Sequence, residues 1–182
     1  MVDLIALACV SIECENSLWV AAMMPDFGRE LDPKRLAKGN PGLPKSVVLP
    51  TIIIKEEDIG RLLDWQTQNS KPIHVWHTFY DRSYGISLEY ANELISTGAI
   101  VGTRQTFQAP GGATSHKTIY KIYYHYGYPL AISNEEPQLE AAHIIDKNGH
   151  ILPYVKFVGG TVTLHSDAIT QLNELETARR RE

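Results

Sequence analysis

Between residues 47 and 80, a strand pattern, a helix pattern and another strand pattern follow one another directly, and this order constrains the fold most. The run VVLPTIII (47–54) is apolar and β-branched, which predicts a buried strand. EEDIGRLLDWQTQN (56–69) has the spacing of an amphipathic helix that opens with acids, and PIHVWHTFY (72–80) predicts the next strand. Strands that alternate with helices predict an α/β core with some parallel pairing.

The front of the chain adds a strand, a short helix and a loop. The apolar run LIALACVSIECE (4–15) predicts a strand, and SLWVAAMM (17–24) predicts a short helix with Asn16 or Ser17 as its N-cap. The segment from Pro25 to Pro50 contains five prolines and three glycines, which excludes long regular elements. We expect it to be an ordered, functional loop.

The back of the chain changes to a mostly antiparallel β pattern. It follows a predicted helix, SLEYANELISTG, with Ser87 as its N-cap. The runs at 117–132 and 143–157 predict strands, and the second run contains KNG (147–149), a typical hairpin turn. The last residues (167–182) predict a polar helix.

Size and composition indicate a single globular domain. The chain has 182 residues, of which 43% are apolar and 21% charged, enough for one sizeable core and too few for two. It has no run of eighteen apolar residues and no signal-peptide pattern, so we expect a cytoplasmic protein. Because an apolar pattern begins at about the fourth residue without a leading cap, the domain is also compatible with the C-terminal part of a longer enzyme.

Charge and cysteine usage limit the partners and the compartment. The formal net charge is -4, so any nucleic-acid partner would have to be held by local basic patches. On one strand, Cys9 and Cys14 would point to opposite faces, which argues against a disulfide between them. A reducing compartment fits this pattern best.

Two acids at the end of the first apolar run are the strongest candidate site. On a strand, Glu13 and Glu15 would share a face at roughly 7 Å from each other. Two like charges so close repel unless a positive group lies between them, and Mg²⁺ takes a few carboxylates together with waters and a phosphate. The alternative is that the strand end is exposed and both acids are simply solvated.

The chain resembles type II restriction endonucleases, and among them the AccI-like group. The resemblance lies in IECENSLW, MPDFGRELDPKRL, LPTIIIKEED, PIHVWHTFYDRSYGIS and the segment from QAPGGAT to KTIYKIYYHY, and it covers most of the chain. It implies a PD-(D/E)xK nuclease core and Mg²⁺-dependent cleavage of double-stranded DNA. It also implies a cognate DNA methyltransferase in the same restriction-modification system, expected genetically and not as a bound partner.

The family motif has an acid, a variable gap, and then Asp or Glu, any residue, and Lys on a strand. Glu13 matches the second acid, and Glu15 occupies the place of the lysine. A carboxylate can hold a metal ion or accept a proton, but it does not supply a positive charge, so Lys55 is a candidate replacement. Asp3 is the only acid upstream, and on one straight strand it would lie more than about 30 Å from Glu13.

Two basic segments are candidate DNA contacts. Lysine and arginine on the segment from Pro25 to Pro50, called the proline-rich loop below, would contact phosphates and release counterions. Arginine and glutamine near Gly111 and Gly112 are side chains that read base edges. An ordinary solvated loop explains either segment equally well from composition alone. The candidates are Lys34, Arg35, Lys38, Lys45, Arg104, Gln105, Gln108, His116, Lys117 and Lys121.

These features predict a type II restriction endonuclease that acts on a short palindromic site. Matching half-sites call for a homodimer. One alternative is an inactive DNA-binding module that lacks the first metal-binding acid, and another is an interaction protein whose acids are solvated. His74 and His77 face opposite ways on a strand and are poor joint metal ligands, so we expect structural roles or one phosphate contact.

Overall fold

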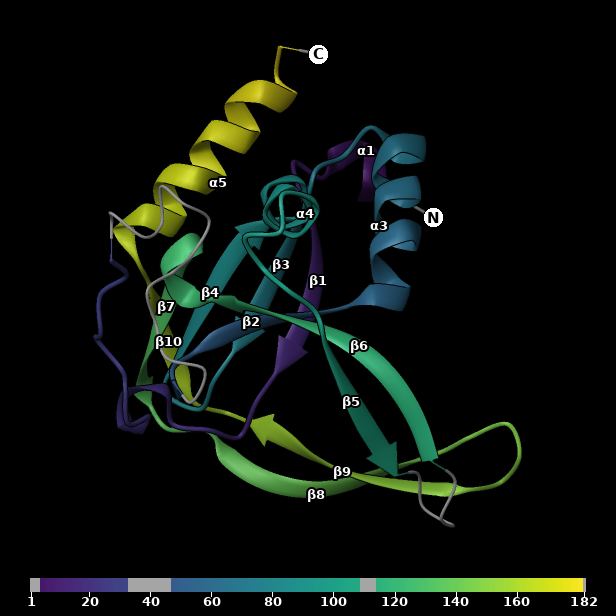
Figure 1. The fold of residues 1–182 in the computed structure, drawn as a ribbon. Coiled ribbons are helices and arrows are strands. Elements are labelled where there is room, and N and C mark those ends of the chain that lie inside the picture. The colour runs from purple at the N-terminus through teal and green to yellow at the C-terminus, as the bar shows by residue number, and fades with distance from the viewer. Residues whose placement is uncertain (1–3, 33–46, 109–113, 182) are drawn as a thin grey trace.

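The computed structural model describes residues 4–32, 47–108 and 114–181 of the chain (Figure 1). Its helices are α1 (Leu4–Leu7), η1 (Ala21–Met23), α3 (Glu56–Asn69), α4 (Leu88–Ser96), η2 (Tyr124–Tyr126) and α5 (Ser166–Arg179). Its strands are β1 (Ser11–Asn16), β2 (Thr51–Lys55), β3 (Ile73–Thr78), β4 (Arg82–Ser87), β5 (Thr103–Gln108), β6 (Thr114–Tyr123), β7 (Tyr128–Glu135), β8 (Gln138–Ile145), β9 (Ile151–Val158) and β10 (Thr161–Leu164).

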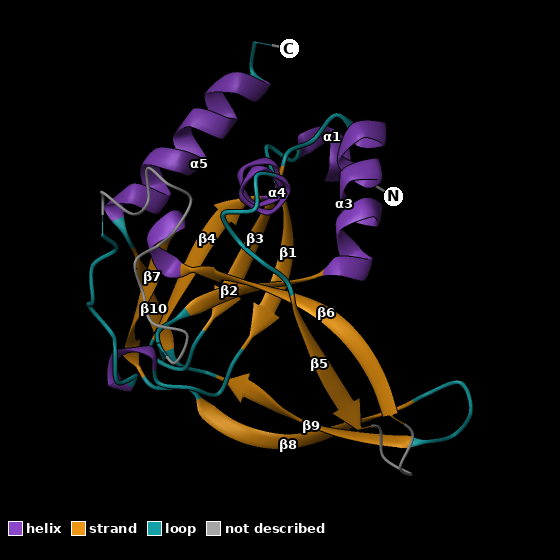
Figure 2. Cartoon of the chain, viewed as in Figure 1, coloured by secondary structure: helices purple, strands orange, loops and turns teal. Residues whose placement is uncertain are grey.

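The strands form separate sheets within the described residues. A central sheet has the order β1-β3-β4-β7-β10, a second sheet has the order β2-β6-β5, and β8 pairs with β9. β1 and β3 are parallel, whereas the other neighbours in the central sheet are antiparallel. The mixed sheet with flanking helices confirms the expected α/β class and its parallel pair (Figure 2).

The main core lies between the two larger sheets and the helices α3 and α4. Ile52 and Ile122 of the second sheet pack with Val75 and Ile86 of the central sheet, and Leu88 of α4 closes the cluster. These five side chains are all 1% exposed or less. The alternating burial of β2 explains the arrangement, because its even-numbered isoleucines are buried and its other residues are partly exposed.

A smaller cluster covers the opposite side of the central sheet. Ala168 of α5 packs against Leu130 and Ala131 of β7, with Trp76 and Tyr128 at its margin. Figure 2 shows α5 beside β7 and β10, away from α3. None of the helices in the described part of the chain is long and apolar enough to cross a membrane.

The front of the chain differs from the sequence-based prediction. Residues Leu4–Leu7 form a helical turn, and β1 begins only at Ser11, so the predicted strand over 4–15 is wrong in its first half. Leucine and alanine are good helix formers, and a short apolar run does not distinguish a helix from a strand. The helix predicted over 17–24 shrinks to η1, and Val20 takes the N-cap position.

The middle and back of the chain agree more closely with prediction. α3 covers residues 56–69 as expected, and α4 begins after Ser87, whose hydroxyl accepts a hydrogen bond from the Tyr90 N–H. β8 and β9 form the predicted hairpin, in which Gly149 has a φ of 82°. A positive φ is the conformation that glycine adopts without steric cost. The C-terminal helix is also confirmed as α5.

Candidate functional site

The acid pair lies on β1, at the edge of the central sheet in the described residues. Glu13 is in register with Val75 of β3, and Glu15 is in register with His77. Because strand residues alternate between faces, both acids share the face of the sheet that carries Val75 and His77. Cys14, between them, is exposed and points to the other face. Both cysteines are free thiols, although Cys9 precedes β1 and does not share a strand with Cys14.

Lys55 meets this pair from the second sheet. β2 ends at Lys55 and α3 begins at the next residue, so the lysine lies at a strand-to-helix junction. Its Nζ donates a hydrogen bond to Glu15 Oε1 over 2.5 Å. Both side chains are partly shielded, with 32% of Lys55 and 24% of Glu15 exposed. Glu15 is therefore ion-paired in this structure and not simply solvated.

The surroundings of Lys55 keep it protonated. The hydrogen bond to Glu15 raises the pKa of Lys55 above its usual value, although partial burial opposes the shift. The charges of Glu15, Asp58 and Glu13 add to the increase. Lys55 therefore carries a positive charge at any pH near neutrality and is not a general base.

Asp58 is a member of this group that sequence reasoning missed. It lies in the first turn of α3 and forms an ion pair with Arg61. From the sequence alone, the acidic run at the start of the helix indicates only a match to the helix dipole. The sequence feature that points to Asp58 is its closeness to the candidate lysine: it lies three residues after Lys55, which ends β2.

The acid pair fits the donor chemistry of a divalent metal ion of the magnesium type. Hard carboxylate oxygens are the ligands that Mg²⁺ prefers, and one or two of them suffice when waters and a phosphate complete the shell. No group of three or more His, Cys, Asp or Glu side chains among the described residues is arranged to hold a metal ion. The first acid suggested by sequence, Asp3, lies outside the described residues.

His77 adds a buried, polar neighbour to the site. It is 1% exposed, and neither ring nitrogen has a hydrogen-bond partner within the described part of the chain. Its ring packs against Phe79 with 4.7 Å between centroids, and burial lowers its pKa to about 4. His74 lies on the opposite face of β3 and its Nδ1 is hydrogen-bonded to the Tyr128 hydroxyl, so the two histidines point apart, as strand alternation predicts.

Asp81 holds the segment that follows β1. Its carboxylate accepts hydrogen bonds from the N–H groups of Ala21 and Ala22, at 2.6 and 3.1 Å, and from Arg82 Nε at 2.7 Å. Burial opposes ionisation here, but the hydrogen bonds from Arg82 and the two N–H groups lower the pKa of Asp81. The Arg82 guanidinium also lies 4.6 Å from the centre of the Phe27 ring.

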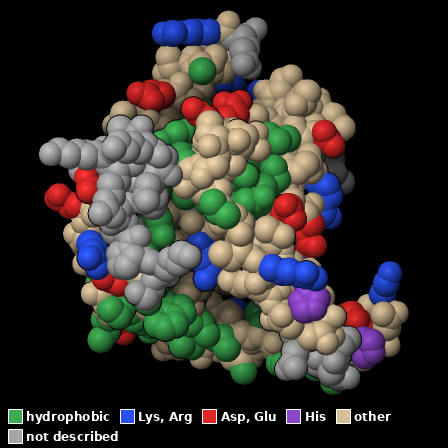
Figure 3. Space-filling view, viewed as in Figure 1, with side chains coloured by type: hydrophobic (Ala, Val, Ile, Leu, Met, Phe, Trp, Pro, Cys, Tyr) green, Lys and Arg blue, Asp and Glu red, His purple; other side chains and the backbone are tan. Residues whose placement is uncertain are grey.

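The candidate DNA contacts on β5 and β6 divide between two faces. The register pairs Gln105 with Lys117, and strand alternation puts these two and Lys121 on the same face as Lys55. Arg104 and His116 lie on the opposite face by the same rule. The predicted contacts are therefore separated by the sheet. Figure 3 shows basic and histidine side chains over β5 and β6 and, separately, over the tip of the β8–β9 hairpin.

Some predicted contacts are engaged elsewhere or lie outside the described structure. Lys117 Nζ bonds Glu57 Oε1 over 2.5 Å, so it would have to leave that pair to bind a phosphate. The side chain of Gln108 is outside the described part of the structure. So are the four basic residues of the proline-rich loop, Lys34, Arg35, Lys38 and Lys45.

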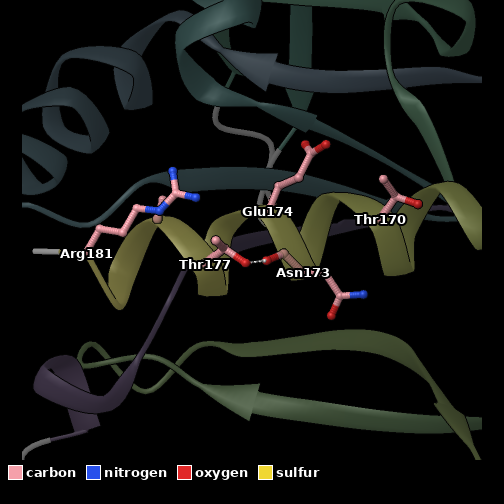
Figure 4. Close-up of a pocket in the computed structure, with 6 residues that line it drawn as sticks. Thr170, Asn173, Glu174, Thr177 and Arg181 are labelled. Atoms are coloured by element: carbon pink, nitrogen blue, oxygen red, sulfur yellow. Dashed lines mark hydrogen bonds between the residues drawn. The ribbon is translucent and has the colours of Figure 1, made fainter.

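Two surface hollows are lined by residues other than the acid pair. One, of about 470 Å³, is lined by Thr170, Asn173, Glu174, Thr177, Ala178 and Arg181 (Figure 4). All six belong to α5 or to the residues just after it, so the hollow lies on one helix and lacks the converging groups of a binding site. The other, of about 280 Å³, lies between the end of β3 and the base of the β8–β9 hairpin.

Comparison with known proteins gave one match. A protein-family model described as AccI restriction endonuclease matches residues 45–179, which include Lys55 but neither Glu13 nor Glu15. No curated protein and no solved structure matched the chain. The matched segment runs from the end of the proline-rich loop to the last residue of α5.

Proposed function

Because the chain belongs to the AccI restriction endonuclease family, we propose that it is a type II enzyme that hydrolyses double-stranded DNA at a short palindromic site with Mg²⁺. The family consists of restriction enzymes that cleave DNA, and restriction endonucleases generally use a divalent metal ion. The observation that carries the proposal is the meeting of Glu13, Glu15 and Lys55 at one edge of the central sheet. A PD-(D/E)xK core, with its mixed sheet and flanking helices, is part of the proposal.

Glu13 and Glu15 would hold the metal ion through their carboxylate oxygens. Bound there, the ion would supply Lewis-acid stabilisation of the phosphate and lower the pKa of a water. Glu15 would also accept a proton, directly or through a water that it holds. Asp3 is the candidate for the first acid of the motif and would be a third metal ligand.

Lys55 would supply the positive charge that the motif lysine provides in other family members. It is bonded to Glu15 and remains protonated, so it orients that carboxylate and brings positive charge to the same place. A fixed charge next to a phosphate stabilises the negative charge that develops during hydrolysis. This role requires no movement of the two sheets relative to each other.

DNA would lie along the face of the second sheet that carries Lys55. Lys121 and Gln105 share that face, and Lys117 would join them on leaving Glu57. Lys34, Arg35, Lys38 and Lys45 would contact phosphates from the proline-rich loop. Arg104 and His116 would contact DNA only if it also reaches the opposite face. Gln108 is kept as a proposed DNA contact, although its side chain lies outside the described residues.

A palindromic site implies a homodimer, because two matching half-sites call for two matching subunits related by a two-fold axis. The enzyme would act in the cytoplasm alongside a cognate DNA methyltransferase. The alternative is an inactive DNA-binding module, and no observation on the described residues favours it over the enzyme.

Plasmid cleavage with mapped ends tests the proposal. With millimolar Mg²⁺ we expect discrete fragments whose ends share one palindromic sequence, and EDTA should abolish them. Glu13→Ala should remove cleavage while folding and DNA binding persist. Cys14→Ala, which changes the exposed residue between the acids, is the matched control and should cut normally. Full activity of Glu13→Ala would reject the site, and binding without cutting by the wild type would favour the inactive module.

A further inference from the structure

Three lysines lie in a row on one face of the second sheet. Lys55 of β2 is in register with Ile119 of β6. Lys117 and Lys121 lie two residues before and two residues after that position. Because every second residue of a strand points to the same face, the three lysines share the face along which the proposed function places DNA. Lys117 and Lys121 are roughly 14 Å apart along the strand, from about 3.4 Å per residue.

The three lysines differ in the partners that hold them. Lys55 is bonded to Glu15 of the acid pair. Lys117 Nζ donates a hydrogen bond to Glu57 Oε1 over 2.5 Å, and the two side chains form an ion pair. Lys121 is exposed, and no ion pair joins it to another of the described residues. Of the two lysines outside the acid pair, one is therefore open to a phosphate and the other is held by a carboxylate.

Glu57 belongs to the first turn of α3, which has three consecutive acids, Glu56, Glu57 and Asp58. Acids at this end of a helix suit its dipole. The dipole does not explain why the Glu57 side chain reaches Lys117 of β6, sixty residues further along the chain. Figure 1 shows the first turn of α3 beside β6. Glu56 also meets β6, but it accepts a hydrogen bond from the Tyr120 hydroxyl at 3.3 Å.

The Glu57–Lys117 pair is close but open to solvent. Lys117 is 33% exposed and Glu57 is 48% exposed. The hydrogen bond from Lys117 lowers the pKa of Glu57, so the carboxylate is charged at neutral pH. An ion pair this exposed contributes little to stability, and a phosphate oxygen brought equally close can therefore replace the carboxylate.

Glu57 also has a second cation beside it. Arg61 lies one turn further along α3, and its Nε donates a hydrogen bond to the Glu57 carbonyl at 3.3 Å. Its charge contributes to the lowered pKa of Glu57. The Glu57 carboxylate therefore keeps a neighbouring positive charge when Lys117 leaves it.

We propose that Glu57 is a specificity-determining residue that withholds Lys117 from DNA until a cognate site is bound. Noncognate DNA is not fixed in one position, so Lys121 contacts its phosphates while Lys117 stays paired with Glu57. In the cognate complex, base contacts fix the duplex beside Lys55, and a phosphate replaces the Glu57 carboxylate on Lys117 Nζ. The inference rests on the proposed function, because it describes how the same DNA-binding face distinguishes cognate from other DNA.

The timing of the Lys117 contact decides its effect on specificity. A lysine that is available to any duplex strengthens cognate and noncognate binding alike, because phosphate contacts do not depend on sequence. A lysine that binds phosphate only in the cognate complex increases the ratio of the two affinities. One contact corresponds to a slope of about 0.9 in log K against log salt, or about eightfold in affinity at 0.1 M relative to 1 M salt.

The salt dependence of noncognate binding tests the proposal. Labelled poly(dA)·poly(dT) is the noncognate duplex, because a repeat of one base pair contains no palindrome, and EDTA prevents cleavage. Glu57→Gln should make the slope of log K against log salt steeper by about 0.9, since it releases Lys117 to a phosphate. Fluorescence anisotropy on the full chain at several salt concentrations measures the slope.

Glu56→Gln is the matched control. It removes the same charge from the same turn of α3, but its side chain bonds the Tyr120 hydroxyl instead of a lysine. Its slope should equal that of the wild type. In the double variant Glu57→Gln/Lys117→Ala the slope should return to the wild-type value, because the added contact is made by Lys117. Urea denaturation shows whether each variant folds.

The cognate duplex should give the complementary result. On a duplex that carries the site mapped by plasmid cleavage, Lys117→Ala should make the slope shallower by about 0.9. On poly(dA)·poly(dT) the same variant should bind like the wild type. Glu57→Gln should reduce the ratio of cognate to noncognate affinity, and it should speed cleavage at sites that differ from the cognate site by one base pair.

Two results would overturn the proposal. One is an equal slope for Glu57→Gln and Glu56→Gln on poly(dA)·poly(dT), and with reduced stability of Glu57→Gln it would make the pair a brace between α3 and β6. The other is a shallower slope for Lys117→Ala on the same duplex. Neither result affects the cleavage site, which Glu13→Ala tests. A wild type without salt-dependent DNA binding would overturn the proposed function as well.

Discussion

Lys55 Nζ lies 2.5 Å from Glu15 Oε1, although the two residues are 40 positions apart in the chain. Lys55 ends a strand of the second sheet, and Glu15 lies near the end of the edge strand of the central sheet. The pair joins the two sheets at the point where the acids gather. Through this pair, Lys55 brings a positive charge to the strand on which Glu15 occupies the place of the motif lysine.

Replacing Lys55 with Met keeps most of the side-chain length and removes the charge. We expect single-turnover DNA cleavage to slow about 100-fold, because a positioned charge next to the reacting phosphate commonly contributes that much. The free energy of unfolding should change by less than about 1 kcal/mol, since the pair is partly exposed. Urea denaturation measures the second quantity.

Lys156→Met is the control for this variant, because it breaks an exposed ion pair of the hairpin, Glu140–Lys156. It should cleave at the wild-type rate. An unchanged rate in Lys55→Met would remove Lys55 from the site.

Lys121 and Arg104 test which face of the second sheet binds DNA. Both are exposed, but only Lys121 shares a face with Lys55. Lys121→Ala should reduce the slope of log K against log salt by about 0.9, the value for one lost phosphate contact, and Arg104→Ala should leave it unchanged. Fluorescence anisotropy with labelled duplex DNA at several salt concentrations measures both slopes. The reverse result would put DNA on the other face.

His77 makes stability depend on pH on the acid side. Its pKa in the folded protein is about 4, below the usual value of 6.5, so the unfolded chain binds the proton first as pH falls. Stability is therefore lost between about pH 6.5 and about pH 4, by about 3 kcal/mol in total. His77→Leu should lose less stability than the wild type over this range in urea titrations.

Asp81 should be needed to hold the segment after β1. Asp81→Ala leaves the N–H of the buried Ala21 without its acceptor, which is expected to cost about 1–3 kcal/mol of unfolding free energy. Asp81→Asn keeps one acceptor oxygen and should cost less. Because the pKa of Asp81 is lowered, its contribution is present above the usual pKa of an aspartate and is lost as pH falls through the folded value. Equal stability of Asp81→Ala and wild type in urea would contradict this role.

The elements predicted correctly are those with a local signal. α3 has acids in its first turn, α4 has a serine cap that bonds the Tyr90 N–H, and the β8–β9 turn has a glycine at positive φ. β4 carries no such signal, since Gly85 interrupts its short run between Tyr84 and Ile86. It forms a strand because it pairs with β3 and β7, and a Cβ at Gly85 would lie 2.5 Å from Tyr128 Cζ.

The sequence by itself determined that Glu13 and Glu15 share one face of a strand, because side-chain alternation is a local property of an extended chain. Only the tertiary structure decided that Lys55 pairs with Glu15 and that Lys121 and Arg104 are on opposite faces. It also decided that neither ring nitrogen of His77 has a hydrogen-bond partner among the described residues. The physical reason is that these relationships depend on which strands pair and how the two sheets pack. Contacts between residues far apart in the chain set that packing, and no local pattern encodes them.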